Sequence, residues 1–276
     1  MARGLALLLV LVGCSAERPT ETFSLDGGDP ADGSSGDGFA PGDGFAIDAP
    51  TFDVPEGGTA TECRIATLGN KGDAGVGDIF AKWLDKSGGK AAAALADKVL
   101  TASLLAPYRV LVVQNVSGNH TYDATEIKVL SDWVKAGGGL MTLTGFAGPS
   151  EVINVNGLLS AYDVGYDNKG ILFGGGTTVA VDTWIAHPVT KGVTRIGVDN
   201  GYAVIGSGTK LAKGGGYDVL EVKEVGSGHV LVWGDEWITF NSEWSAHPDY
   251  QVQVFWQNIV DWFAPGAGCK VPDPPK

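Results

Sequence analysis

Polar and aromatic side chains directly follow several apolar runs that we expect to be buried strands. In open sheets built from alternating strands and helices, ligands bind beyond the carboxyl ends of the strands. Amides, carboxylates and aromatic rings together suit a sugar, because its hydroxyls bond to polar groups while its flat face packs on a ring. The candidate binding residues are Asn70, Asp73, Gln114, Asn115, His120, Phe146, Asp235, Glu236 and Trp237, with Ser150 and Asn241 in similar positions.

The adjacent acids Asp235 and Glu236 raise the question of acid–base chemistry. A glycoside hydrolase needs two carboxylates at a defined separation across a cleft. Neighbouring residues on a strand point to opposite faces of the sheet, so we do not expect these two acids to act as a pair. We assign no catalytic residue. A hydrolase that uses Asp235, Glu236 or a histidine stays open as an alternative.

The histidines, with Asp235 as a further ligand, suggest a metal site as a second candidate. His120, His187 and His247 show neither the HxH nor the HExxH spacing that holds a metal on one element. The two histidines that precede a proline, His187 and His247, indicate turns, and His229 precedes its strand and belongs to the opposite edge. We predict no metal site and no cofactor.

The elements that position these residues come from the apolar pattern of residues 61–269, which we expect to be one α/β domain. Apolar runs at 64–69, 108–115 and 140–144 predict buried strands. Between them, apolar side chains at helical spacing around 76–84, and a capping box that starts at Asp123, predict helices. This alternation predicts a doubly wound, mostly parallel sheet.

The second half of that domain is richer in glycine and in short apolar runs, so we expect it to be rich in β-strands. Residues 171–228 contain several such runs separated by glycine clusters, and 225–228 indicate a hairpin that leads into a strand at 229–234. A last amphipathic helix is expected over about 250–263, where apolar side chains share one face.

The first fourteen residues have the pattern of an export signal. Arg3 is followed by an apolar run at 5–12 and then by Gly13 and Cys14. The run is too short to span a bilayer, which takes about 20 residues. The motif resembles a bacterial lipobox, and the resemblance implies that residues 1–13 are removed and that Cys14 is lipidated. Ser15 favours the outer membrane by the same resemblance, and an ordinary secretory signal is the alternative.

Residues 14–60 are expected to be a disordered linker behind the lipidated cysteine. From 15 to 60 the chain has ten acids, one base, five prolines and nine glycines, a composition that cannot bury enough apolar surface to fold. The sequence GDGFA occurs at 36–40 and again at 42–46. Its spacing does not match a calcium-binding loop, so we predict a solvated spacer. Residues 270–276 are expected to be a flexible tail.

The three cysteines divide into Cys14 and a pair that flanks the domain, Cys63 and Cys269. The first strand begins at the edge of the sheet where the last, antiparallel helix is expected to end, so these two cysteines are placed to form a disulfide. Export makes a disulfide chemically reasonable. Two unpaired thiols are the alternative.

The formal net charge of −13 limits the partners. Binding to nucleic acid depends largely on Lys and Arg side chains that neutralise phosphates, so we exclude nucleic acid. Most of the acidity lies in the linker. The charge of residues 61–276 therefore indicates no particular partner.

Four local motifs, taken in their order, resemble one protein family. They are Asn156-Gly-Leu-Leu with Tyr162, His187-Pro-Val-Thr with Gly192, the run from Gly228 to Asp235, and Asn258-Ile259 with Trp262. Together they are similar to class I glutamine-amidotransferase-like domains, in particular to the ThuA-like branch. The resemblance covers about 200 residues and implies a flavodoxin-like fold.

The sequence departs from this family at the residue that does the chemistry. The family carries a nucleophilic cysteine after the strand that we place at 140–144, where this chain reads Thr144-Gly145-Phe146-Ala147. A threonine hydroxyl is a poor nucleophile without a strong base, and the activating His-x-Glu is absent as well. We therefore reject glutamine amidotransfer.

Three functions remain. The first is a surface-tethered envelope lipoprotein, exported and anchored to the membrane through Cys14, whose domain binds a ligand such as carbohydrate without catalysis. The second is a hydrolase on the same scaffold, and the third is a purely structural envelope lipoprotein.

Overall fold

The computed structural model of the chain describes residues 63–69, 78–86, 93–95, 98–114, 116, 120–145, 149–172 and 178–271. The predicted export signal, Cys14 and the linker lie outside these residues. So do four of the candidate binding residues, which are Asn70, Asp73, Asn115 and Phe146. Within the described residues, no helix is both long and apolar enough to cross a bilayer.

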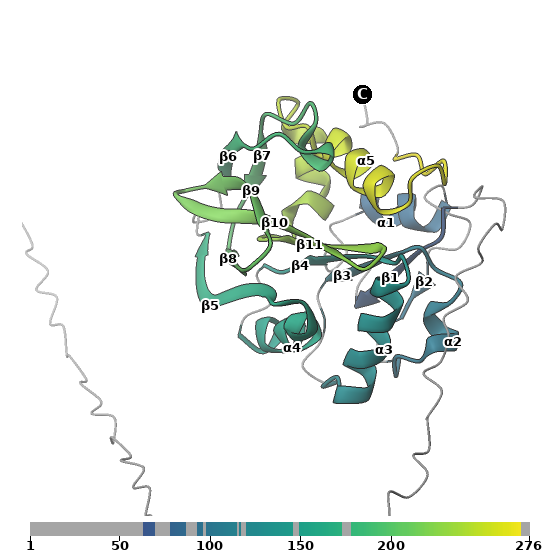
Figure 1. The fold of residues 1–276 in the computed structure, drawn as a ribbon. Coiled ribbons are helices and arrows are strands. Elements are labelled where there is room, and N and C mark those ends of the chain that lie inside the picture. Colours follow the sequence, from purple (N-terminus) through teal and green to yellow (C-terminus); the bar gives the residue numbers. More distant parts are fainter. Residues whose placement is uncertain are drawn as a thin grey trace, which may run out of the picture. The chain divides into compact units, whose positions relative to one another are not determined.

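The core of the fold is a nine-stranded sheet (Figure 1). Its strands lie in the spatial order β2 (Ala93–Ala94), β1 (Ile65–Gly69), β3 (Val110–Gln114), β4 (Gly139–Leu143), β11 (Gly228–Trp233), β10 (Tyr217–Val225), β9 (Thr209–Gly214), β6 (Val179–Trp184) and β7 (Ile196–Val198). A separate two-stranded antiparallel sheet consists of β5 (Val164–Leu172) and β8 (Gly201–Gly206).

The prediction of a doubly wound, mostly parallel sheet is wrong. The strands from β2 to β11 in spatial order pair in parallel, but those from β11 to β7 pair antiparallel. The reason is the short turns of the second half: Gly215 and Gly216 join β9 to β10, and Gly226 joins β10 to β11, all with positive φ. A two-residue turn can only join antiparallel neighbours, so the fold is a mixed, β-rich sheet.

Helices cover both faces of this sheet (Figure 1). One face carries α1 (Asp78–Lys86) and α5 (Val252–Phe263), and the other carries α2 (Ala102–Leu105), α3 (Ala124–Lys135) and α4 (Pro149–Leu159). Shorter turns are the 3₁₀ helices η1 (Ser160–Tyr162), η2 (Pro188–Thr190) and η3 (Trp237–Thr239), and the π-helix η4 (Ser242–Ala246).

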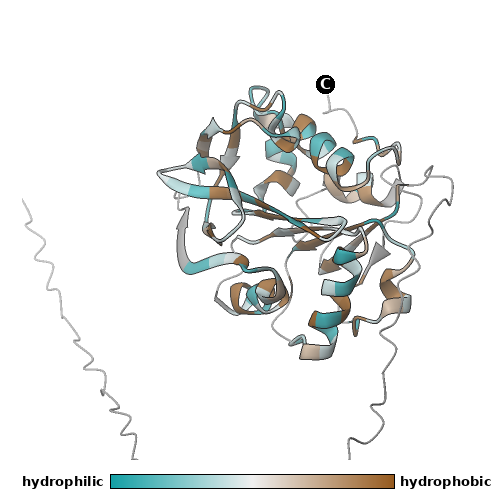
Figure 2. Cartoon of the chain, in the orientation of Figure 1, coloured by the Kyte–Doolittle hydropathy of each residue, from teal (hydrophilic) through white to brown (hydrophobic). Residues whose placement is uncertain are grey.

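Two apolar cores lie on opposite faces of the sheet, as the alternation of side chains along a strand requires. On β3, Val110 and Val112 belong to the core beneath α1 and α5, whereas Leu111 and Val113 belong to the core beneath α3 and α4. Figure 2 shows hydrophobic residues along the central strands and both kinds of residue on α3. The strands predicted at 64–69, 108–115 and 140–144 and the helix predicted at 250–263 are found as β1, β3, β4 and α5.

The capping box at the start of α3 is confirmed. The Asp123 carboxylate accepts hydrogen bonds from the backbone N–H groups of Thr125 and Glu126, at 2.8 and 2.9 Å. The Glu126 carboxylate accepts one in return from the backbone N–H of Asp123 at 3.1 Å. Otherwise unpaired donors of the first helical turn are thereby satisfied.

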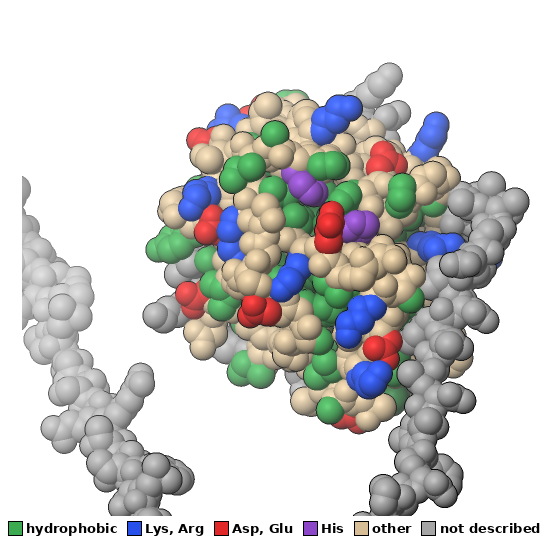
Figure 3. Space-filling model, viewed as in Figure 1, with side chains coloured by type: hydrophobic (Ala, Val, Ile, Leu, Met, Phe, Trp, Pro, Cys, Tyr) green, Lys and Arg blue, Asp and Glu red, His purple; other side chains and the backbone are tan. Residues whose placement is uncertain are grey.

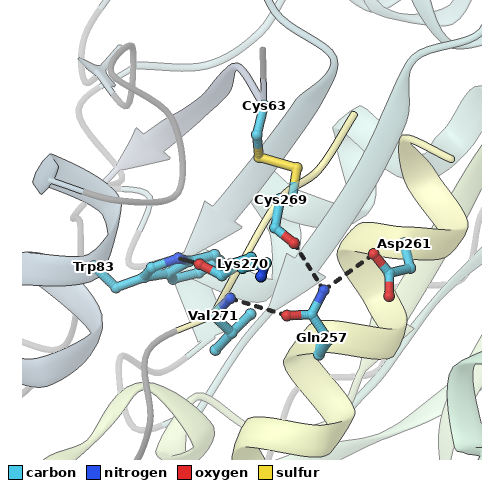
Figure 4. Close-up of a disulfide and its surroundings, with 7 residues drawn as sticks. All are labelled: Cys63, Trp83, Gln257, Asp261, Cys269, Lys270 and Val271. Carbon is cyan, nitrogen blue, oxygen red and sulfur yellow. Dashed lines mark hydrogen bonds between the residues drawn. A yellow bond between two sulfur atoms is a disulfide. The ribbon is translucent and has the colours of Figure 1, made fainter. Parts of the chain in front are cut away.

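The predicted disulfide between Cys63 and Cys269 is also confirmed, and it closes a sequence separation of 206 residues. Figure 4 shows how the segment after Cys269 is held between α1 and α5. The Gln257 side chain donates to the carbonyl oxygen of Cys269 at 2.8 Å and accepts from the N–H of Val271 at 3.0 Å. The Trp83 indole donates to the carbonyl oxygen of Lys270 at 2.9 Å.

Replacing both Cys63 and Cys269 with serine should lower the free energy of unfolding. Closing a loop of this length stabilises a protein by about 5 kcal/mol in the chain-entropy model, because the crosslink restricts the unfolded chain. Urea unfolding of the double variant and of the parent, both in a Cys14→Ser background, measures the difference. Dithiothreitol should lower the stability of the parent to that of the variant. Equal stability without reductant would contradict the prediction.

Candidate functional site

The strands β3, β4 and β11 are neighbours, and polar residues at and just beyond their carboxyl ends form what we call the carboxyl-edge cluster. It consists of Gln114, Thr144, Asp235 and Glu236, all of which are buried. A Cβ atom on Gly145 would lie 2.8 Å from Cγ of Glu236 and 3.1 Å from Oδ1 of Asp235. Three predicted site residues, Gln114, Asp235 and Glu236, therefore lie at the expected edge of the sheet.

Asp235 is bonded to the backbone by both carboxylate oxygens. Oδ1 accepts from the N–H groups of Glu236 and Trp237, at 2.6 and 3.3 Å, and Oδ2 accepts from the N–H of Asp199. The side chain is 0% exposed, and this burial raises its pKa well above the usual value even though the three N–H groups act to lower it. The arrangement fixes the backbone and leaves Asp235 poorly placed to exchange a proton with a ligand.

The segment that Asp235 holds is the turn between β7 and β8. Asn200 has a positive φ of 57°, and its side-chain amide donates to the carboxylate of Asp199 at 2.9 Å. Gly201 then passes so close to β11 that a Cβ atom there would lie 1.9 Å from the carbonyl oxygen of Gly234. That oxygen accepts from the N–H of Tyr202 at 2.7 Å. Only glycine allows this approach.

His120 belongs to a different network. Its Nε2 lies 3.0 and 3.2 Å from the two carboxylate oxygens of Glu126, so the ring joins the N-terminal cap of α3. The ring also packs edge-on against Tyr122, with centroids 4.7 Å apart, and the His120 carbonyl accepts from Asn154. These contacts assign His120 to the packing of α3 and α4.

Trp237 and Phe240, in contrast, form a half-buried aromatic pair beside the cluster. Their rings are stacked, with centroids 5.2 Å apart and planes inclined by 10°. The next residue, Asn241, accepts from the backbone N–H of Ile79 at 2.8 Å and so ties this loop to α1. Trp237 was among the predicted site residues, but Phe240 was not.

Glu243 is a second residue that the sequence analysis missed. It lies on the π-helix η4, a kind of element found frequently at functional sites, and it is 1% exposed. Its pKa is raised to about 7: burial is the main cause, the N–H of Gly197 lowers the pKa, and the nearby Asp249 raises it. Nothing in the sequence around it distinguishes Glu243 from a surface acid, because the burial comes from β7 and the following turn.

The remaining histidines take part in local packing. His187 accepts from the N–H of Val189 through Nδ1, at 3.2 Å, and so caps η2 at the predicted turn. His229, the second residue of β11, packs on Trp262, with ring centroids 4.2 Å apart. Among the residues that the structure describes, no group of three or more His, Cys, Asp or Glu side chains could hold a metal ion.

A shallow groove of about 260 Å³ lies between the end of α4 and the pair β5 and β8. Its floor includes Gly165 and Gly206, and its wall includes Ile205, which is 50% exposed. Tyr166 connects the groove to the main sheet, because its hydroxyl donates to the carbonyl oxygen of Trp233 at 3.0 Å and bonds to Thr142 at 2.8 Å.

No protein-family model and no curated protein matches this sequence. Among solved structures, the chain is similar to the N-terminal domain of mmIFT52, with a TM-score of 0.56 and 14% identity over 73% of this chain and 98% of that one. It is also similar to a cytoplasmic protein from Salmonella typhimurium LT2, with a TM-score of 0.56 and 16% identity over 73% of this chain and 99% of that one. At these identities the similarity shows the fold alone.

Replacing Gly201 with alanine should destabilise the protein by about 3 kcal/mol, since the added methyl group would overlap the carbonyl oxygen of Gly234. Gly157→Ala on α4 is the matched control, because a Cβ atom there meets nothing within 4 Å. That control should stabilise by up to about 1 kcal/mol, the difference in helix propensity. Urea unfolding measures both, and equal stabilities of the two variants would contradict the close approach.

Replacing Glu243 with glutamine should remove part of the pH dependence of stability. Because the folded pKa, about 7, is above the ordinary 4.5, the folded state binds this proton more tightly than the unfolded state does. The stabilisation is complete below pH 4.5 and is lost as the pH rises through 7. Its full size is about 3 kcal/mol.

Urea unfolding at pH 4.5 and pH 8 tests whether stability falls as the pH rises, as the raised pKa of Glu243 predicts. The wild type should lose more stability between the two values than Glu243→Gln does. Asp182→Asn, on an exposed position of β6, should follow the wild type. An identical loss in the wild type and Glu243→Gln would show that Glu243 does not have the raised pKa.

Proposed function

We propose that this protein is an exported lipoprotein, anchored to the outer membrane through Cys14, whose domain binds carbohydrate without catalysing a reaction. The proposal for export and anchoring is supported by the apolar run at 5–12 and by Gly13 and Cys14 directly after it. Residues 15–60 then act as the spacer between the lipid and the domain. Their ten acids repel one another and favour an extended chain.

The observation that carries the non-catalytic part of the proposal is the bonding of Asp235. A general acid or base must reach the proton that it transfers, whereas this carboxylate is 0% exposed and accepts three backbone hydrogen bonds. Thr144, which the sequence resemblance aligns with the cysteine of the amidotransferase-like family, is also 0% exposed. The hydrolase alternative, with Asp235, Glu236 or a histidine as the reactive group, therefore has less support.

The face of the domain that Figure 3 shows gives no support for a nucleic-acid ligand. Figure 3 shows basic side chains scattered among acidic and apolar ones on the face in view, without a continuous basic stripe. A stripe of Lys and Arg is the usual electrostatic feature of a protein that binds a phosphate backbone. The confirmed disulfide fits export, because structural disulfides persist in oxidising compartments.

Replacing Cys14 with serine should abolish lipid attachment. In a bacterial host that processes lipoproteins, the wild type should incorporate an alkyne-labelled palmitate and fractionate with the membranes, while Cys14→Ser should lose the label and become soluble. The variant that replaces both Cys63 and Cys269 is the control and should keep the label. Labelled, membrane-bound Cys14→Ser would overturn the anchoring.

A further inference from the structure

The turn η3 places Trp237 and Phe240 on one side of the chain. Residues three apart on a 3₁₀ helix lie directly above one another, and the two rings are therefore stacked. Ile238 and Thr239, between them, are both 0% exposed and point into the protein. The same turn thus buries its middle residues and leaves the two rings half-buried.

The two rings are held on a fixed backbone. The carbonyl oxygen of Ile238 accepts from the indole N–H groups of both Trp244 and Trp256, at 3.0 Å each. The N–H of Phe240 donates to the carbonyl of Trp237 at 2.8 Å. A surface that is already ordered loses little conformational entropy when a ligand binds, so this turn is suited to binding.

Another aromatic pair shows what ordinary core packing looks like in this fold. Trp184 and Trp233 also stack, with an inclination of 11°, but Trp233 is 0% exposed and belongs to the core beneath α5. Trp237 and Phe240 are both only half-buried. Contact between apolar surface and water is unfavourable. A flat ligand that covers the two rings would therefore gain free energy by removing that surface from water.

The charges within this loop bear on the class of ligand. Residues 234–246 contain three acids and no Lys or Arg, so this loop provides no cation for an acidic ligand. The three acids, Asp235, Glu236 and Glu243, are 0, 2 and 1% exposed and present no carboxylate to a cationic ligand. Asn241, Ser242 and Ser245 add polar groups to the same loop.

We infer that the outer face of the stacked Trp237–Phe240 pair is a platform for the flat face of a neutral pyranose ring, so that the ligand of this domain is a neutral polysaccharide. The inference rests on the proposed binding function and names its ligand class and its site. The ring hydrogens of the sugar pack on the aromatic faces, and the hydroxyls at the ring edge remain for the polar groups of the loop.

The test uses the full chain with Cys14→Ser. Affinity electrophoresis in gels that contain laminarin, soluble xylan or mannan provides the neutral polysaccharides, and gels with polygalacturonate or chitosan provide an acidic and a basic one. The parent should be retarded by at least one neutral polysaccharide and not by polygalacturonate. Chitosan attracts any chain with a net charge of −13 and should retard the parent and Trp237→Ala equally. Trp237→Ala and Phe240→Ala should each weaken that retardation at least about tenfold, as truncation of a central aromatic contact does.

Controls separate loss of the platform from loss of the fold. Tyr217→Ala removes an aromatic ring that is 43% exposed on β10 and should bind like the parent. Trp237→Phe keeps a ring at the platform and should retain most of the affinity. Phe240→Leu keeps apolar volume without a ring, should fold even if Phe240→Ala does not, and should bind weakly. Thermal unfolding confirms that each variant is folded.

Two results would overturn the inference in different ways. Undiminished binding by folded Trp237→Ala, Phe240→Ala and Phe240→Leu would show that the sugar binds elsewhere, and the proposed binding function would survive. No retardation of the parent by any neutral polysaccharide would refute both the platform and carbohydrate binding. Retardation by polygalacturonate alone, or a retardation by chitosan that Trp237→Ala reduces, would refute the neutral ligand class.

Discussion

The end of β11 is the point on which the rest of the structure depends. There the parallel and antiparallel halves of the sheet meet, and β8 crosses so closely that Gly201 lies against the carbonyl oxygen of Gly234. Asp235 fixes the crossing, because its carboxylate receives the N–H of Asp199 from the turn before β8. Burying an acid is costly unless hydrogen bonds compensate it. The three backbone donors to Asp235 offset part of that cost, although burial still raises the pKa of the carboxyl group.

This constraint changes what the carboxyl edge of the sheet can do. A position that would suit a catalytic acid is occupied by a side chain that holds two backbone segments together, and its neighbour Glu236 is 2% exposed. The side chains that remain accessible to a ligand lie a few residues further along the chain. They are the two aromatic rings at the turn η3. Because fold alone does not determine function, the proposed binding role depends on these particular side chains and not on the sheet.

The sequence predicted the features that depend on local patterns. The strand at β3, the capping box at Asp123 and the pairing of Cys63 with Cys269 follow from apolar runs, residue spacing and the expected position of the chain ends. The mixed sheet was only partly predictable in this way. The glycine turns that make β9, β10 and β11 pair antiparallel are local, and the hairpin at 225–228 was expected, but the pairing of β9 with β6 joins strands that are distant in sequence. Phe240 and Glu243 were missed for a related reason. Their environments arise from a 3₁₀ turn and from the approach of Gly197, neither of which has a local pattern.

Helix α5 connects the platform to the disulfide. Trp256 donates its indole N–H to Ile238, between the two platform rings, and the next residue, Gln257, bonds to the carbonyl oxygen of Cys269. On its other side Trp256 packs against Phe80 of α1, with ring centroids 4.6 Å apart. One turn of α5 therefore positions both the C-terminal segment and the proposed sugar platform. Because the disulfide holds that segment in place, the geometry of the platform should be most rigid after oxidation, which is the state that export favours.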